Sequence, residues 1–193
     1  MTWIKICGIT STLDAEAAIE VGASAIGLVF ATSSPRQVTV EAAQRIAACA
    51  RDRVEIVGLF KEPAVADAAH AAIHFDRIQL YGKARLGTDV RVLRVVHPDD
   101  LDPAPSMSAG EIMLIDGSEG RGVKFDWDRV RFYAAPLVIA GGLTPENVGE
   151  AITMARPFGV DVSSGVECAP GLKDLEKLNR FVDAVRRADA ARD

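Results

Sequence analysis

Short apolar runs recur along the chain and alternate with amphipathic stretches. The runs are nearly continuous rather than alternating, which is typical of parallel strands that are buried on both faces. Most of them end in glycine, serine or aspartate, residues that favour a turn. This pattern predicts eight strands, at residues 3–7, 25–30, 54–60, 77–80, 91–96, 112–116 and 137–140, and from 159 to the serines at 163–164.

Helical spacing follows most of these runs. It predicts helices from Ser11 or Thr12 to Gly22, over 40–51, from Pro63, from Asp126 or Trp127, over 145–154, and from Asp174 onward. Eight strands that alternate with helices favour an α/β fold, and the number eight favours a closed (β/α)₈ TIM barrel formed by residues 1–193 as a single domain. An open, doubly wound sheet is the alternative architecture.

Two of the eight units are short. About 8 residues separate Gly82 from the next strand, too few for a full crossover helix. The segment 97–110 contains Pro98, Pro103 and Pro105, which do not fit inside a regular helix. The spacing therefore predicts abbreviated helices in units 4 and 5.

Composition narrows the choice of partners. The 193 residues carry a net charge of −5, which argues against nucleic acid or an anionic membrane as the main partner. Neither a leader sequence nor an 18-residue apolar run is visible, so we expect a cytoplasmic protein. The three cysteines lack metal-ligand spacing, and His70 and His74 fit the solvent-facing side of a helix, so we expect no metal.

The last two predicted strands both end in small residues. Gly141 and Gly142 follow one strand, and Ser163, Ser164 and Gly165 follow the next. Small residues let backbone N–H groups approach a ligand closely, and in a (β/α)₈ barrel the loops after strands 7 and 8 frequently bind phosphate. The pattern predicts a phosphate site between them. Other polar residues at strand ends include Cys7, Arg36, Gln79, Asp116 and Asp161.

Four candidate residues, three of these and also Asp126, allow two interpretations each. Cys7 is either a small buried residue or a thiolate that acts as base or nucleophile. Asp126, between two aromatic residues, is either a helix N-cap or a general acid in surroundings of low polarity. Arg36 is either a solvated charge or a bidentate clamp for a carboxylate. Asp161 ends an apolar strand and needs a partner, either a sugar hydroxyl or loop N–H groups.

Several motifs, in this order, resemble those of the phosphoribosylanthranilate isomerase family, (β/α)₈ enzymes of tryptophan biosynthesis. The match spans nearly the whole chain. The motifs are Lys5-Ile6-Cys7-Gly8-Ile9-Thr10, Ser34-Pro35-Arg36, Gln79-Leu80-Tyr81-Gly82, Phe125-Asp126-Trp127, Ala140-Gly141-Gly142-Leu143, Pro145-Glu146-Asn147-Val148, Asp161-Val162-Ser163-Ser164-Gly165-Val166-Glu167, Pro170-Gly171 and Lys173-Asp174.

The resemblance implies an Amadori rearrangement without a cofactor. Asp126 would be the general acid that opens the ribose ring, and Cys7 the general base that removes the C2 proton. Arg36 would bind the anthranilate carboxylate, and the two Gly/Ser loops the phosphate. The partner would then be a small phosphosugar, with the protein a monomer or a homodimer.

Two departures from the family pattern leave other functions open. Tyr81 stands where the family usually has histidine, and the loop before Asp126 reads Glu119-Gly120-Arg121-Gly122, in which Arg121 adds a cation or blocks the site. One alternative is a related ribosyl-phosphate isomerase with a shifted substrate, although such relatives place a carboxylate where this chain has Cys7. The other is a phosphosugar-binding homologue without catalysis, against which the intact Cys7 and Asp126 argue.

Overall fold

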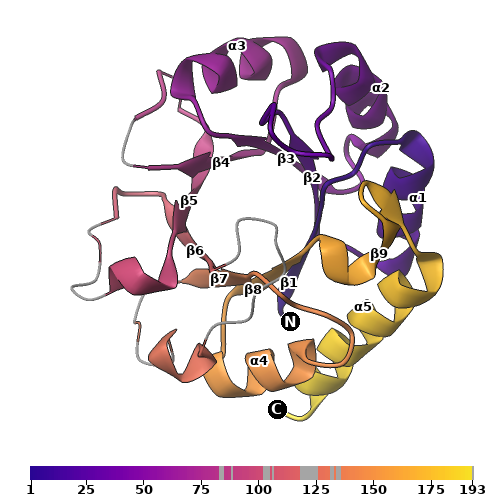
Figure 1. The fold of residues 1–193 in the computed structure, drawn as a ribbon, viewed down its shortest axis with the longest axis vertical. Coiled ribbons are helices and arrows are strands. Elements are labelled where there is room, and N and C mark those ends of the chain that lie inside the picture. Colours follow the sequence, from indigo (N-terminus) through magenta and orange to yellow (C-terminus); the bar gives the residue numbers. More distant parts are fainter. Residues whose placement is uncertain are drawn as a thin grey trace.

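Eight parallel strands form a closed barrel in chain order (Figure 1). The computed structural model describes residues 1–193 except 83–84, 88, 102–104, 106, 118–125, 131–132, 134–135 and 193. Because β1 pairs in parallel with both β2 and β8, the sheet is closed, and the open doubly wound alternative is ruled out. The strands are β1 (Trp3–Cys7), β2 (Ala25–Val29), β3 (Glu55–Phe60), β4 (Arg77–Tyr81), β5 (Arg91–Val96), β6 (Ile112–Asp116), β7 (Leu137–Ala140) and β8 (Gly159–Val162).

Helices cover the outside of the barrel (Figure 1). Ser11 caps the first of them by accepting a hydrogen bond from the backbone N–H of Asp14, and Gly22 ends it with a φ of 96°, as the sequence predicted. Pro63 opens the third, also as predicted. The described α-helices are α1 (Thr12–Val21), α2 (Val40–Ala50), α3 (Pro63–Ile73), α4 (Val148–Ala155) and α5 (Leu175–Ala190).

The barrel cover is thin after β4, β5 and β6. Among the described residues, no helix lies between β4 and β5, and only the 3-10 helix η1 (Pro98–Leu101) follows β5. The abbreviated units 4 and 5 are thus confirmed. The helix predicted from Asp126 or Trp127 is shorter than expected, because the described residues there form only the 3-10 helix η2 (Trp127–Val130).

The segment before α4 also differs from the prediction. The helix begins at Val148 rather than at 145. The Asn147 side chain accepts a hydrogen bond from the backbone N–H of Thr144 (2.8 Å) and donates one to the carbonyl of Gly142 (2.9 Å). These two bonds hold residues 142–147 as a turn, so the helix starts only after it.

Two apolar layers hold the barrel together. The outer layer packs the helices against the strands, and it contains Ile6, Ile26 and Ile56. The inner layer fills the barrel with Ala25, Val57, Leu93, Leu114, Val138 and Ala140. Since successive residues of a strand point to opposite faces, both layers draw on the same continuous apolar runs.

A small hairpin follows β8 that the sequence did not predict. It consists of the 3-10 helix η3 (Ser164–Val166) and the antiparallel strands β9 (Glu167–Ala169) and β10 (Leu172–Lys173). The hydroxyl of Thr10, after β1, donates a 2.6 Å hydrogen bond to the carbonyl of Gly171 at its tip. The hairpin therefore lies over the end of β1, beside the strand ends that the sequence marked as functional.

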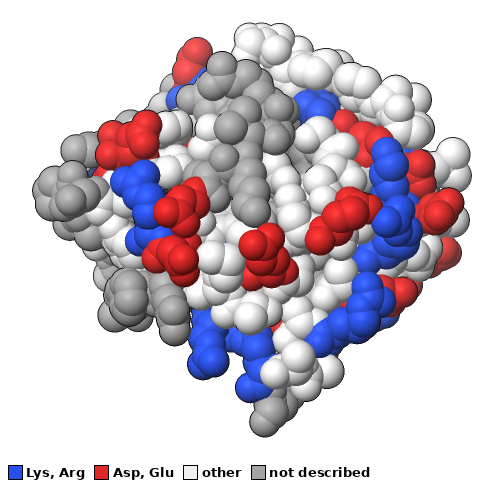
Figure 2. All heavy atoms as spheres, turned by 60° about the horizontal axis from the view of Figure 1, so that its bottom comes forward, with Lys and Arg blue, Asp and Glu red and all other residues white. Residues whose placement is uncertain are grey.

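Basic and acidic side chains are intermixed on the face that carries α4 and α5 (Figure 2). Arg180 on α5, for example, pairs with Glu146 before α4 at 2.5 Å. None of the helices described is long and apolar enough to cross a membrane.

Candidate active site

A pocket of about 310 Å³ opens at the carboxyl ends of the strands. This is the end at which (β/α)₈ barrels place their ligands. Its walls come from the ends of β1, β2, β3, β4, β6, β7 and β8 and from the loops that follow them. The lining residues are Cys7, Val29, Ala31, Ser33, Ser34, Pro35, Arg36, Leu59, Lys61, Gln79, Tyr81, Asp116, Ala140, Gly141, Gly142, Leu143, Asp161, Val162, Ser163 and Ser164.

Nearly all site residues that the sequence singled out meet in this pocket. Two candidates lie outside the lining: Gly165, which directly follows the lining residue Ser164, and Asp126. The residues that line it are Cys7, Arg36, Gln79, Gly141, Gly142, Asp161, Ser163 and Ser164.

The loops after β7 and β8 touch each other. Gly141 and Gly142 have φ values of 84° and 67°, a conformation that residues with a side chain rarely adopt. A Cβ atom on Gly165 would lie 1.9 Å from the carbonyl oxygen of Leu143, which is far inside any permitted contact. These glycines therefore allow the two loops to form one continuous wall of small residues.

Two buried polar atoms of the pocket residues have no partner among the described residues. They are Oγ of Ser163 and Oδ1 of Asp161. A buried hydroxyl or carboxylate oxygen without a hydrogen bond is costly, so such atoms are expected to bind a ligand or water. Ser163 lies beside the wall of small residues. Asp161 lies two residues earlier, on β8, and so deeper in the barrel. The pocket therefore offers hydrogen bonds at two depths.

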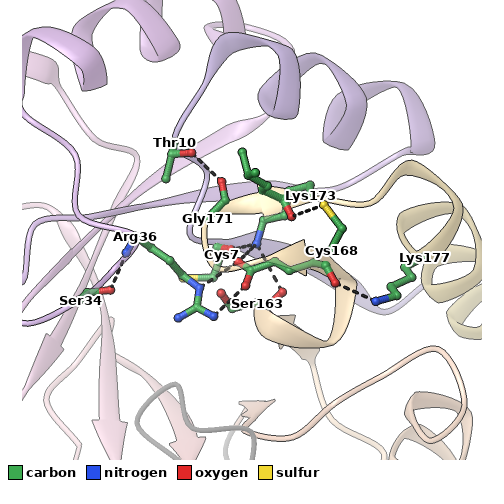
Figure 3. A network of polar contacts seen from close by, with 11 residues as sticks. Cys7, Thr10, Ser34, Arg36, Ser163, Cys168, Gly171, Lys173 and Lys177 are labelled. Carbon is green, nitrogen blue, oxygen red and sulfur yellow. Dashed lines mark hydrogen bonds and ion pairs between the residues drawn. The ribbon is translucent and has the colours of Figure 1, made fainter.

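The guanidinium of Arg36, which is labelled in Figure 3, is held by Glu167. Nε donates to Oε1 at 2.8 Å and Nη2 donates to Oε2 at 2.7 Å. Ser34 fixes the preceding turn, because its hydroxyl accepts a 3.1 Å hydrogen bond from the backbone N–H of Arg36. Glu167 occupies one edge of the planar guanidinium, so the edge formed by Nη1 and Nη2 can serve an anion in the pocket.

Lys173 connects the pair of Arg36 and Glu167 to the ends of β1 and β8, where Cys7 and Ser163 lie (Figure 3). Its ammonium donates to Oε1 of Glu167 (2.8 Å) and to the carbonyls of Cys7 (2.6 Å) and Ser163 (3.3 Å). Burial raises the pKa of the Glu167 carboxyl, but Arg36 and Lys173 outweigh that effect and hold it below its ordinary value. The hairpin thus connects the arginine, the cysteine and the serine loop through one ionised carboxylate.

Cys7 is a free thiol at the end of β1, buried to 6% exposure. Burial raises the pKa of the thiol, the Lys5 ammonium lowers it and the Asp161 carboxylate raises it further, so that the pKa stays above its ordinary value. Cys7 is therefore a buried residue that lines the pocket among charged groups, and its role as a base or nucleophile stays a prediction.

Asp126 occupies a different environment. Its side chain is exposed, and Oδ1 accepts a 3.1 Å hydrogen bond from the backbone N–H of Asp128 at the start of η2. That contact is the capping role that the sequence allowed. The adjoining residues 118–125, which include Arg121 and Phe125, lie outside the described part of the chain.

Sequence reasoning missed several charged residues of the site. Lys5 is fully buried inside the barrel, where its ammonium donates 2.8 Å hydrogen bonds to Oδ2 of Asp161 and Oε1 of Gln79. A lysine in the middle of the apolar run of β1 was the available signal. Lys61 lies with its ammonium 5.7 Å from the ring centre of Tyr81, so Tyr81 meets a cation at the pocket wall.

The fold and the pocket define a (β/α)₈-barrel protein with a candidate ligand site, lined in part by basic side chains, at the carboxyl end of its strands. Comparison with known proteins narrows this class. Residues 4–184 match the family model described as N-(5'phosphoribosyl)anthranilate (PRA) isomerase. The chain therefore belongs to the phosphoribosylanthranilate isomerase family, as its motifs predicted.

Individual relatives agree. The chain is 44% identical over 201 residues to the N-(5'-phosphoribosyl)anthranilate isomerase of Acidithiobacillus ferrooxidans, covering 96% of this chain and 98% of the relative. The crystal structure of phosphoribosyl anthranilate isomerase from Thermotoga maritima superposes with a TM-score of 0.85 at 32% identity, covering 97% of this chain and all of that one. A complex of phosphoribosyl anthranilate isomerase with reduced 1-(o-carboxyphenylamino)-1-deoxyribulose 5-phosphate gives a TM-score of 0.84 at 33% identity, covering 97% of this chain and 100% of the other.

Proposed function

We propose that this protein converts N-(5-phosphoribosyl)anthranilate into 1-(2-carboxyphenylamino)-1-deoxyribulose 5-phosphate. The observation that carries the proposal is one pocket that combines an anion clamp, a wall of small residues and a buried thiol. The named relatives favour this isomerase over the alternatives of a shifted substrate or a non-catalytic homologue.

The reaction needs one acid and one base. Protonation of the ring oxygen lets the bond between C1 and that oxygen break, which leaves an iminium at C1 whose nitrogen accepts electrons. A base then removes the proton from C2, and the C–H electron pair forms the C1–C2 double bond of an enolamine. Proton return to C1 and loss of the enol proton give the ketone, with no net change in atoms or electrons.

The pocket suggests how the substrate lies. Its phosphate is assigned to the wall of Gly141, Gly142 and Ser164, with the Ser163 hydroxyl as a donor, and its carboxylate to the open edge of Arg36. Anchors at both ends would hold the ribose carbons over Cys7, the proposed base, and Asp161, the proposed partner of a sugar hydroxyl. Fixing the two ends in this way lowers the entropic cost of reaching the transition state.

Asp126 is proposed as the acid because it occupies the acid's position in the family motif. Asp116 supplies a direct comparison, because it ends β6, is 8% exposed and lines the pocket. The experiment is steady-state turnover of freshly made phosphoribosylanthranilate, followed by the loss of its fluorescence, for the wild type, Cys7→Ser, Asp126→Asn and Asp116→Asn.

Each outcome has a distinct meaning. We expect kcat to fall by about 100- to 10,000-fold in Cys7→Ser and in Asp126→Asn, the range for losing a general acid or base, with the fold retained in circular dichroism. If kcat falls by this amount in Asp116→Asn and is unchanged in Asp126→Asn, then Asp116 is the general acid instead. Wild-type protein that binds the product but turns over no substrate would refute the enzymatic function.

A further inference from the structure

Lys5 and Cys7 point into the barrel from the same strand. They are two residues apart on β1, so their side chains lie on one face of the sheet, with Cys7 nearer the pocket. The Lys5 ammonium is fully buried and donates to Oδ2 of Asp161 and Oε1 of Gln79, both at 2.8 Å. An ammonium has three N–H donors, and these two contacts leave the third for the neighbouring sulfur.

Gly27 on β2 makes this arrangement possible. It is paired with Cys7 in the register of the two strands. A Cβ atom at position 27 would lie 2.8 Å from Sγ of Cys7 and 3.0 Å from Cε of Lys5, closer than real side chains approach. Because Gly27 has no side chain, the aliphatic part of Lys5 and the thiol of Cys7 both have room beside β2.

Other charged groups also face Cys7. Arg36 approaches from the loop after β2, Lys173 from β10 and Asp161 from β8. Asp161 in turn interacts with Asp116 on β6, and Tyr81 on β4 packs against the small cluster that contains Cys7. Lys5 has the largest electrostatic effect on the thiol of these groups and acts to lower its pKa, against the effects of burial and of Asp161.

The geometry points to Lys5 as a positioning residue for proton transfer: its ammonium, held in place by Asp161 and Gln79, stabilises the negative charge on the Cys7 sulfur. This inference rests on the proposed role of Cys7 as the base. It gives the buried lysine a function beyond neutralising Asp161, because a thiolate in a buried pocket needs a fixed positive charge beside it.

The test is a titration of the Cys7 thiol in the free protein, by ultraviolet thiolate absorbance. Cys49 and Cys168 are replaced by alanine and serine, and a Cys7→Ser protein supplies the background. We expect Lys5→Met to raise the midpoint by about 1 to 3 pH units, the usual effect of an adjacent opposite charge. Lys5→Arg, which keeps the charge, should return it toward the wild-type value.

Lys173→Met is the matched control. It also removes a buried lysine near Cys7, but that ammonium contacts the carbonyl of Cys7 rather than its thiol, so the midpoint should move less. In turnover, kcat/KM of Lys5→Met at neutral pH should fall by about tenfold for each pH unit of the shift and recover as the pH rises. A lysine that only supports the fold would leave the thiol midpoint where it is.

If Lys5→Met does not fold, the double variant Lys5→Met/Asp161→Asn decides the question, because it removes both members of this buried ion pair. Its midpoint should still rise, by less than in the single variant, since Lys5 acts on the thiol more strongly than Asp161 does. A midpoint that stays or falls in a folded variant overturns the inference. The titration needs no substrate, so this failure is distinct from an absence of isomerase activity in the wild type.

Discussion

Arg36 and Glu167 face each other across the rim of the barrel, joined by two parallel hydrogen bonds of 2.8 and 2.7 Å. The two residues are 131 positions apart in the sequence. Burial lowers the pKa of Arg36, but its hydrogen bonds to Glu167 have the larger effect and raise it above its ordinary value. The pair thus holds a permanent cation with a fixed orientation at the pocket, which a flexible lysine could not provide.

The first prediction concerns this orientation. Arg36→Lys keeps the charge but loses the second edge of the guanidinium, on which the carboxylate of the substrate is proposed to lie. We expect KM to rise by about 10- to 100-fold, since a charge-assisted hydrogen bond contributes about 1.5–3 kcal/mol. Steady-state kinetics with phosphoribosylanthranilate measure it. Arg53→Lys is the control and should leave KM unchanged, because the Arg53 side chain pairs with Glu16 on the surface and is 44% exposed.

A second prediction concerns the close approach of the two loops. Gly165→Ala places a methyl group where the carbonyl of Leu143 lies, so the loops must separate. We expect weaker binding of inorganic phosphate and of the substrate, and a loss of about 1–3 kcal/mol in the free energy of unfolding, the range for overpacking. Calorimetric titration with phosphate and urea denaturation provide the two measurements.

Gly149→Ala is the matched control for that substitution. The position lies on α4, and outside its own helix backbone the nearest atom to an added Cβ would be the carbonyl oxygen of Ala184, at 3.9 Å. Alanine is also the better helix former, so this variant should be no less stable than the wild type. Equal phosphate affinity in Gly165→Ala and Gly149→Ala would contradict a phosphate site at the wall of small residues.

The third prediction is the pH dependence of catalysis. Burial holds the pKa of the Cys7 thiol above its ordinary value, and a base must be deprotonated to act. In Asp126→Asn, where the pH dependence of the proposed acid is removed, kcat/KM should therefore rise about tenfold per pH unit and continue to rise past pH ~8.5, the ordinary thiol value. A limb that levels off below neutral pH would mean that another group is the base.

The fourth prediction is the acid sensitivity of the fold. The pKa of Glu167 is depressed in the folded state, so its ionised form stabilises the protein above the unfolded value, and this contribution is lost as the pH falls through the folded value. Glu167→Gln should therefore lower the free energy of unfolding at neutral pH by about 1–3 kcal/mol and lose stability less steeply below about pH 4. Urea denaturation across that range measures both.

Glu20→Gln on the exposed side of α1 is the control for this substitution. It should follow the wild-type pH dependence within the error of the measurement. If Glu167→Gln does the same, the ion pairs with Arg36 and Lys173 contribute nothing to stability.

Local patterns along the chain were enough to predict the barrel. Each apolar run had to be buried on both faces, and each turn was marked by residues with a conformational reason to be there, such as Gly22 and Pro63. For the same reason most of the site was predictable. Parallel strands bring their carboxyl ends to one rim, so Cys7, Arg36 and Ser163 had to lie near one another.

Tertiary structure alone decided which charges pair and which of them lie beside the Cys7 thiol. Lys5 pairs with Asp161, 156 positions away in the sequence. Arg36 pairs with Glu167, 131 positions away, and Glu167 lies in a hairpin whose sequence has no strong hydrophobic pattern. Whether Lys5 reaches the thiol depends on Gly27 of the neighbouring strand, which is a matter of register. Apolar periodicity is a local property that one stretch of chain carries by itself, whereas an ion pair depends on distance and burial, which exist only once the barrel has closed.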